Sequence, residues 1–263
     1  MSCEKILIFA FARCGSGALL DFTNDLFPEN LMHEPFNDDN KILLLHKKEN
    51  GIKSSLSKIK RKYAGLKHIQ GQLTLKENRE LLSDPDLSVF FLYRKNSYAR
   101  TVSLLISQKR KIWDRNLRKA SHTPLGSLSI DLIQKGIDSY EKDVVTYRNF
   151  LRENTIPHTE ITYESLYDPQ VTAQEKLQEI KRIFSPIRML PKDEIILRKI
   201  NSYFSPKKKH NTSKNYNQIS NIREIDKAFG EKYSPLLQNK HQTFLEKIFS
   251  FMEYLFGFSS ARK

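Results

Sequence analysis

The sequence predicts an α/β fold with three layers, in which a mostly parallel sheet lies between two sets of helices and a helical C-terminal extension follows. An apolar run near the N-terminus passes through a glycine turn directly into a helical pattern. Two further apolar runs, at 87–93 and 158–163, alternate with helical segments. Because 263 residues can bury one large core, we expect a single domain, with a core at 1–170 and helices at 171–263.

The first strand is expected at Ile6–Phe11, a nearly continuous run of β-forming apolar residues that is typical of the centre of a parallel sheet. A turn with Gly15 and Gly17 follows, and apolar residues then recur at helical spacing as far as Leu26. A strand, a glycine turn and a helix in this order direct backbone N–H groups and the positive end of a helix dipole to one point. That point suits a phosphate or a sulfate.

Side chains in this turn strengthen the interpretation. Arg13 offers a permanent charge and Ser16 a hydroxyl, while the glycines let the backbone approach a ligand closely. Ordinary βα turns also contain glycine, so Arg13 is the feature that favours an anion site. The turn is not a Walker A loop, because the Gly-Lys-Ser/Thr ending is missing. It is not a phosphatase cysteine loop either, because Cys14 lacks the flanking His and Arg.

A short extended segment that leads into a loop is expected at 29–37, where Pro35 favours an extended backbone at Glu34. His33 and Glu34 are then neighbours just beyond the anion turn, although a surface acid before a proline explains Glu34 equally well. A basic helix at 41–63 follows, and its charge is typical of a solvated face. Next come a short strand at 68–70 and a helix at 77–82.

The strand at 87–93 ends in Arg94, and Ser103 lies about two turns into the helix that follows. Ligands bind at this end of the strands in α/β proteins, and a guanidinium together with a hydroxyl suits a phosphate there. A salt bridge explains Arg94 equally well when that residue is taken alone.

The rest of the chain is predominantly helical. An amphipathic helix is expected at 130–153, a strand at 158–163, and helices at about 172–184 and 192–203. The charged segment at 205–214 is interpreted as a lid over an anionic ligand or as a disordered spacer. The aromatic tail from His241 is typical of a core or dimer face, and an interfacial membrane contact is a third interpretation.

Composition limits the partners and the setting. The net charge of +14, from 44 basic and 30 acidic residues, favours a nucleic acid, an anionic membrane or a phosphorylated small ligand. Neither a signal peptide nor a membrane-spanning helix is expected, because the N-terminal apolar run is short and no apolar run reaches about 18 residues. Cys3 and Cys14 provide neither a disulfide framework nor a zinc site, so we expect a cytoplasmic setting.

Four segments, in this order, resemble the sulfotransferases that use 3′-phosphoadenosine-5′-phosphosulfate (PAPS). Arg13–Leu19 is similar to their sulfonate-donor loop, and Glu34-Pro35 to the Glu-Pro segment of carbohydrate-type members. The stretch from Arg94 through Ser103 to Trp113 resembles the 3′-phosphate motif of bacterial members that act on glycolipids. Tyr163–Leu166 is similar to the family's Tyr-Glu-Asp-Leu stretch.

The resemblance covers roughly the first 170 residues and implies a P-loop-like, nucleotide-binding core. Cys14, Gly17 and Ser165 depart from the family's pattern, in which a serine, a hydroxyl residue and an aspartate are usual. These departures bear on donor affinity and activity. The C-terminal third is only loosely similar, so the acceptor's identity does not carry over.

The implied reaction transfers a sulfonate group in line from PAPS to an acceptor hydroxyl, without a metal, and releases adenosine 3′,5′-bisphosphate. Glu34 is implied as the general base, with His33 in reserve, and Arg13 as the residue on the leaving 5′-phosphate and the sulfonate. Loop residues hold the 5′-phosphate, Arg94 and Ser103 take the 3′-phosphate, and Tyr163 lies near the adenine. The implied donor site therefore comprises Arg13, Cys14, Gly15, Ser16, Gly17, Ala18, Arg94, Ser103 and Tyr163.

The same kinship implies a glycan or glycolipid acceptor and no nucleic acid. A membrane-linked acceptor would place the enzyme at the inner face of the membrane, with the aromatic tail as the peripheral contact or as the face of a homodimer. Three alternatives stay open. They are a P-loop-type nucleotide kinase, a basic nucleic-acid-binding protein, and a catalytically degenerate sulfotransferase, the last suggested by Gly17 and Ser165.

Overall fold

The computed structural model describes residues 5–27, 30–111, 125–205 and 216–237. These residues form two compact units. The first unit combines residues 1–104 with 136–209, and the second combines residues 105–135 with 210–263.

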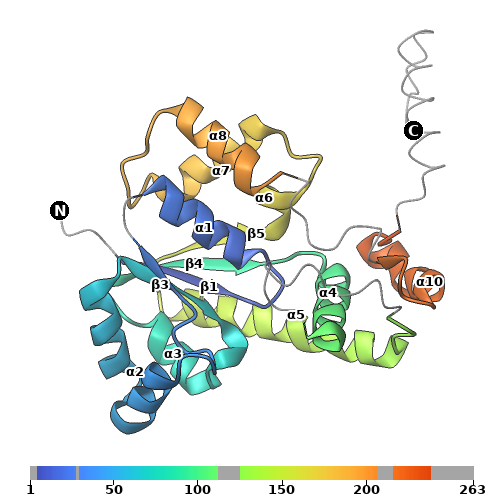
Figure 1. Ribbon diagram of the computed structural model, residues 1–263, viewed down its shortest axis with the longest axis horizontal. Coiled ribbons are helices and arrows are strands. Elements are labelled where there is room, and N and C mark those ends of the chain that lie inside the picture. The colour runs from blue at the N-terminus through green and yellow to red at the C-terminus, as the bar shows by residue number, and fades with distance from the viewer. Residues whose placement is uncertain (1–4, 28–29, 112–124, 206–215, 238–263) are drawn as a thin grey trace. The chain divides into compact units, whose positions relative to one another are not determined.

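A parallel sheet of five strands forms the centre of the first unit (Figure 1). The strand order is β2-β3-β1-β4-β5, and each pair of neighbours is parallel. This arrangement confirms the predicted parallel α/β fold. The strands are β1 (Lys5–Ala10), β2 (Leu31–His33), β3 (Gly65–Ile69), β4 (Leu87–Tyr93) and β5 (His158–Thr162).

Helices cover both faces of this sheet (Figure 1). One face carries α1 (Ser16–Leu26), α6 (Tyr163–Tyr167), α7 (Ala173–Phe184) and α8 (Asp193–Tyr203), and the other carries α2 (Lys41–Lys62), α3 (Leu75–Leu82) and α5 (Ile130–Glu153). A 3-10 turn, η1 (Gln70–Gln72), follows β3, and α4 (Ser97–Arg110) follows β4. The predicted helical C-terminal part is confirmed by α7, α8 and, in the second unit, α10 (Ile222–Tyr233).

The core lies on both sides of β1, whose residues from Ile6 to Ala10 are at most 1% exposed. Aromatic side chains alternate between the two faces, as the period of a strand requires. Phe9 packs against Tyr147 of α5 with ring centroids 5.0 Å apart, whereas Phe90 packs against Phe184 of α7 at 5.2 Å. A strand buried on both faces explains why its sequence is continuously apolar.

The order of the strands places a topological switch at β1. From β1 the chain first builds β2 and β3 on one side and then β4 and β5 on the other. The loops that leave the carboxyl ends of β1 and β4 therefore diverge, and open α/β sheets bind ligands between two such loops. The anion turn predicted at residues 13–17 lies in the first of these loops.

Several local predictions differ from the structure, for example at β3, β5 and α2. β3 begins at Gly65, earlier than the predicted 68–70, because its buried Lys67 and His68 hide the apolar pattern of a strand. The predicted strand at 158–163 ends at Thr162, whose side chain accepts a hydrogen bond from the Ser165 amide and begins α6. The predicted helix at 41–63 is present but is kinked at Gly51.

Several predicted features fall outside the described residues: Trp113, nearly all of the 205–214 segment and the aromatic tail from His241. Within the residues that the structure does describe, no helix has both the length and the apolar character needed to cross a bilayer.

Candidate functional site

The loop between β1 and α1 has the backbone geometry of an anion site. Arg13 and Gly15 have φ angles of 69° and 86°, so the chain turns sharply before α1 begins at Ser16. No side chain among the described residues caps α1. The first N–H groups of a helix lack partners inside it, and here the amides of Ser16 and Gly17 have no acceptor among the described residues, while the Ala18 amide donates to the Gly15 carbonyl at 3.1 Å.

Gly15 is required at this turn for two reasons. Its positive φ is unfavourable for a residue with a side chain, and a Cβ atom there would lie 2.6 Å from the ring of Tyr167. The Tyr167 hydroxyl donates a hydrogen bond of 2.7 Å to the Gly15 carbonyl. Tyr167, which the sequence analysis did not single out, therefore fixes the beginning of α1 from the side of α6.

The structure brings Arg13 and Ser103 together. Arg13 Nε donates a hydrogen bond to Ser103 Oγ over 3.0 Å, although the two residues are 90 positions apart. Ser103 lies on α4 and is 3% exposed. Ser103 is expected to share an anion with Arg94, and the guanidinium that it contacts in the structure is the one from the β1–α1 loop.

Arg94 faces α6. Its guanidinium lies over the Tyr163 ring, 4.3 Å from the centroid, and Tyr163 in turn stacks on Tyr167 at 4.6 Å. Arg94 Nε is 4.0 Å from a carboxylate oxygen of Glu164 and has no hydrogen-bond partner among the described residues. The structure thus also brings together Arg94 and Tyr163, two residues that the resemblance assigned to the nucleotide.

The beginning of α4 differs from that of α1, because a carboxylate of the protein already occupies it. Glu164 accepts hydrogen bonds from the backbone amides of Lys95 and Asn96, over 2.9 and 3.0 Å. The Asn96 side chain accepts another hydrogen bond from the Ala99 amide at 2.8 Å and so caps α4. The protein's own side chains thus occupy these amides before and at the beginning of α4, unlike the amides of Ser16 and Gly17 at α1.

Tyr140 of α5 joins the two loops. Its hydroxyl accepts from the Arg94 amide at 2.7 Å, donates to the Arg94 carbonyl at 2.9 Å, and lies 3.6 Å from Cys14 Sγ. Arg100 supports the same place, because its Nε donates to the Ala12 carbonyl at 3.0 Å and its guanidinium lies over the Tyr140 ring. The sequence placed Tyr140 only on an apolar helix face, and no local motif marked Arg100.

Burial favours the neutral forms of the Cys14 thiol and the Tyr140 hydroxyl, which lie side by side between the two loops. It raises the pKa of the Cys14 thiol, against the opposing effects of Arg100 and of the hydrogen bond with Tyr140. Burial also raises the pKa of Tyr140 far above its ordinary value. A thiol that resists ionisation is a poor nucleophile, so Cys14 is suited to a packing role in the loop.

Glu34 lies in a separate cluster at the ends of β2 and β3. Lys67, which is 4% exposed, donates a hydrogen bond to Glu34 Oε1, and Gln72 donates to Oε2 over 2.6 Å. His33 Nε2 is 3.2 Å from Lys67 Nζ and 3.6 Å from Glu34 Oε1. Burial acts to raise the pKa of Glu34, but the Lys67 charge and these hydrogen bonds outweigh it and lower that pKa.

The backbone of Glu34 is not extended as Pro35 led us to expect. Its φ is 43°, because the chain turns immediately after β2. The Glu34 amide donates to the Lys67 carbonyl, and the Glu34 carbonyl accepts from the Asn37 amide, over 3.0 and 3.1 Å. These bonds favour the turn over the preference of a residue that precedes proline. Glu34 follows β2, which is two strands from β1, a separation of about 10 Å.

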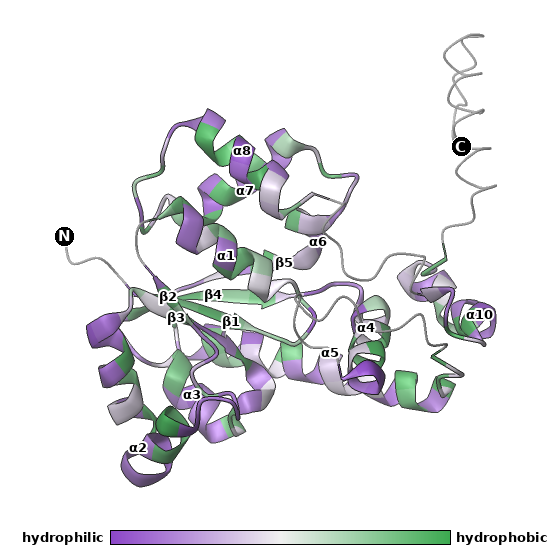
Figure 2. Ribbon diagram, in the orientation of Figure 1, coloured by the Kyte–Doolittle hydropathy of each residue, from purple (hydrophilic) through white to green (hydrophobic). Residues whose placement is uncertain are grey.

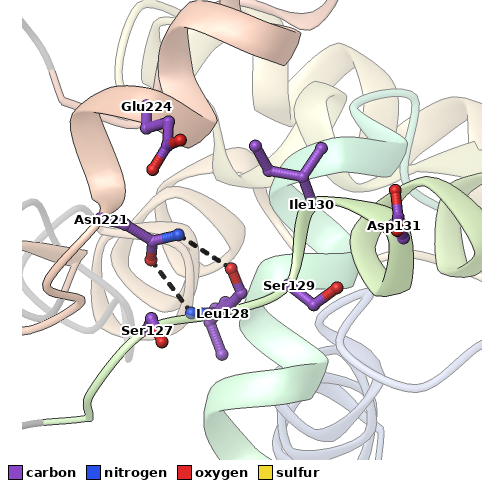
Figure 3. A pocket seen from close by; sticks show the side chains of 7 residues that line it. All are labelled: Ser127, Leu128, Ser129, Ile130, Asp131, Asn221 and Glu224. Carbon is purple, nitrogen blue, oxygen red and sulfur yellow. Dashed lines mark hydrogen bonds between the residues drawn. The ribbon is translucent and has the colours of Figure 1, made fainter.

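Two cavities lie elsewhere in the molecule. One, of about 410 Å³ in the first unit, is lined by Ser165, Val171, Glu175, Gln178, Glu179 and Arg182. The other, of about 450 Å³ in the second unit, lies where α5 begins, beside the Asn221 amide that holds the Leu128 backbone (Figure 3). Neither cavity includes a predicted site residue. No group of three or more His, Cys, Asp or Glu residues in the described part of the chain is placed to hold a metal.

Comparison with known proteins does not place the chain in a family. No family model matches the chain, and no curated protein sequence matches it. Any functional conclusion therefore depends on the geometry of the two clusters, one around Arg13 and Arg94 and the other around Glu34.

Proposed function

We propose that this protein is a PAPS-dependent sulfotransferase that transfers a sulfonate group to a hydroxyl of a carbohydrate or glycolipid. The observation that carries the proposal is the 3.0 Å hydrogen bond between Arg13 and Ser103. The two residues come from separate motifs assigned to one donor nucleotide. They meet at the edge of the sheet where α/β proteins bind ligands.

Arg13 and the beginning of α1 fit a 5′-phosphosulfate group. The uncapped helix offers backbone N–H donors, and Arg13 adds a charge that does not depend on pH. When the bond between sulfur and the 5′-phosphate oxygen breaks, negative charge grows on that oxygen. Arg13 is the group that stabilises this charge.

Arg94 and Tyr163 fit the other end of the donor. Arg94 keeps an Nε–H without a hydrogen-bond partner in the described part of the chain, and this donor suits the 3′-phosphate. Tyr163, which stacks on Tyr167 and lies under the Arg94 guanidinium, is the aromatic residue that this proposal assigns to the neighbourhood of the adenine.

Glu34 is the general base in this proposal. Its lowered pKa keeps it ionised at neutral pH, and Lys67 and Gln72 hold its two oxygens. As the acceptor oxygen bonds to sulfur, its proton passes to Glu34, and adenosine 3′,5′-bisphosphate leaves with the electron pair of the broken S–O bond. Glu34 follows β2 and Arg13 follows β1, and the separation of about 10 Å between these strands leaves room for the acceptor hydroxyl and the sulfonate.

Binding of adenosine 3′,5′-bisphosphate tests the donor site. We expect this product to raise the melting temperature, and Arg13→Ala and Arg94→Ala each to weaken its binding by about 10- to 100-fold, the loss typical of a charged hydrogen bond. Arg198→Ala, at an exposed arginine of α8, is the control and should bind like the wild type. A wild type that binds ATP with magnesium or DNA, but ignores the bisphosphate, would contradict the proposal.

Turnover tests the base. Incubation of radiolabelled PAPS with a cell-envelope extract should transfer label to an acceptor. Glu34→Gln should retain bisphosphate binding and lower this transfer by about 10²- to 10⁴-fold. Transfer at the wild-type rate would remove Glu34 from this role, while the donor site would still stand on the binding data.

A further inference from the structure

Helix α2 carries a large part of the protein's positive charge. Its 22 residues include eight lysines and arginines and one acid, Glu49, a net charge of +7. This is half of the net charge of the whole chain, +14. Figure 2 shows hydrophilic residues along much of this helix.

Only two of the eight cations are neutralised within the described residues. Lys47 pairs with Glu77 at 2.9 Å, and Lys60 pairs with Asp84 and Asp86 at 2.8 and 2.7 Å. The other six side chains are exposed and form no ion pair with any residue that the structure describes. They are Lys41, Lys48, Lys53, Lys58, Arg61 and Lys62.

The first half of α2 also exposes two large apolar side chains. Ile42 is 83% exposed and Leu45 is 57% exposed. At 3.6 residues per turn, Lys41, Ile42, Leu45 and Lys48 share an arc of about 120° on the helix. We call these four residues the α2 patch. The packing of α2 against the rest of its unit instead uses the partly buried Leu43 before the kink at Gly51 and the buried Ile52, Leu56 and Ile59 beyond it.

We propose that the α2 patch docks on the surface of an anionic lipid bilayer. Lysines that flank exposed apolar side chains are the pattern of a helix that lies in the bilayer interface, where the apolar groups enter the acyl boundary and the cations meet lipid phosphates. A nucleic acid would pair with the lysines but would leave Ile42 and Leu45 in water. The six unpaired cations of α2 give long-range attraction to such a surface, and the patch supplies the contact.

This inference does not depend on the proposed reaction, because a protein without sulfotransferase activity would present the same patch. If both hold, the helix that begins seven residues after Glu34 meets the surface in which a glycolipid acceptor lies.

The test uses the full chain and flotation of lipid vesicles. One set contains phosphatidylcholine alone, and the other contains one part phosphatidylserine to two parts phosphatidylcholine. We expect the wild type to float with the anionic vesicles only. Lys41→Glu with Lys48→Glu should lower that binding by about 20-fold or more, since each lysine near an anionic surface contributes roughly a fivefold gain. Ile42→Ser with Leu45→Ser should lower it by about tenfold at unchanged charge.

Matched pairs on α5 are the controls. Lys135→Glu with Lys142→Glu makes the same change in net charge, and Leu132→Ser with Val145→Ser removes apolar side chains that are 51% and 50% exposed. The proposal is overturned if these controls lose as much binding as the α2 pairs, or if both kinds of vesicle bind equally. Tight binding of a short RNA oligomer that needs the lysines but not Ile42 and Leu45, without vesicle binding, would also overturn it.

Discussion

The hydroxyl of Tyr140 is the most informative single group to remove. Tyr140→Phe keeps the ring, which packs on Phe11 with centroids 5.2 Å apart, and deletes the atom that holds both the amide and the carbonyl of Arg94. A typical hydrogen bond contributes about 0.5–1.5 kcal/mol, and a buried group left without a partner costs about 1–3 kcal/mol. We therefore expect the free energy of unfolding to fall by about 2–4 kcal/mol.

Tyr147→Phe is the matched control. Tyr147 lies two turns further along α5 and is also buried, and its hydroxyl accepts from the Asn78 amide at 3.0 Å and from Gln70 at 3.4 Å. The Asn78 amide keeps its bonds to the carbonyls of Gln70 and Leu73 without that hydroxyl. This variant should therefore lose only about 1 kcal/mol.

Two measurements separate the variants. Urea unfolding gives the difference in free energy. Amide hydrogen exchange at Arg94 should accelerate in Tyr140→Phe, because that amide loses its acceptor, and should stay unchanged in Tyr147→Phe. If the two variants lose equal stability and Arg94 exchanges at the same rate in both, Tyr140 does not join the loops as argued.

Three further perturbations follow from the structure. Burial lowers the pKa of His68 to about 4, whereas the unfolded chain binds the proton near pH 6.5. The contribution of His68 to the free energy of unfolding should therefore be constant above pH 6.5 and fall by about 3 kcal/mol as the pH drops to 4. Urea unfolding measured across this range should show the fall in the wild type and not in His68→Gln. Lys67→Met removes the ammonium beside Glu34 and should raise the pKa of the Glu34 carboxyl, which NMR titration measures. The control Lys47→Met breaks the ion pair with Glu77 and should leave the pKa of Glu34 unchanged. Gly15→Ala should lower the free energy of unfolding by at least about 1 kcal/mol, measured by thermal unfolding, and should weaken bisphosphate binding. Gly71→Ala should change neither, because its new Cβ would meet no atom within 4 Å. Equal effects of the two substitutions would refute the steric argument.

Local sequence signals were sufficient for the elements that determine the fold. The strand at 87–93 and the helix at 130–153 have the predicted bounds, because each has a complete apolar pattern of its own period. The turn around Gly15 was predictable for the same reason, since its strand, glycine and helix are contiguous. The sequence predicts a mostly parallel sheet but not the order of its strands, because which strands become neighbours depends on long-range packing.

The site was predictable by residue but not by partner. Arg13, Ser103, Arg94 and Tyr163 were all named in advance, yet the pairing of Arg13 with Ser103 and of Arg94 with Tyr163 requires the fold. Lys67 was not predictable as a site residue, because a lysine in a strand interrupts the apolar pattern of the sequence. Its contact with Glu34 depends on the pairing of β2 with β3. Tyr140 was hidden because it has the same helical spacing as the apolar residues that surround it.

In the proposed donor site, the carboxylate of Glu164 at the amides of Lys95 and Asn96, just before α4, has a consequence for selectivity. The Ser16 and Gly17 amides of α1 have no acceptor among the described residues, whereas the protein's own chain occupies the amides before α4. A solute with a single negative group would therefore bind at α1. A solute with two would also engage Arg94 in competition with Glu164, so its second anionic group has to displace an internal carboxylate.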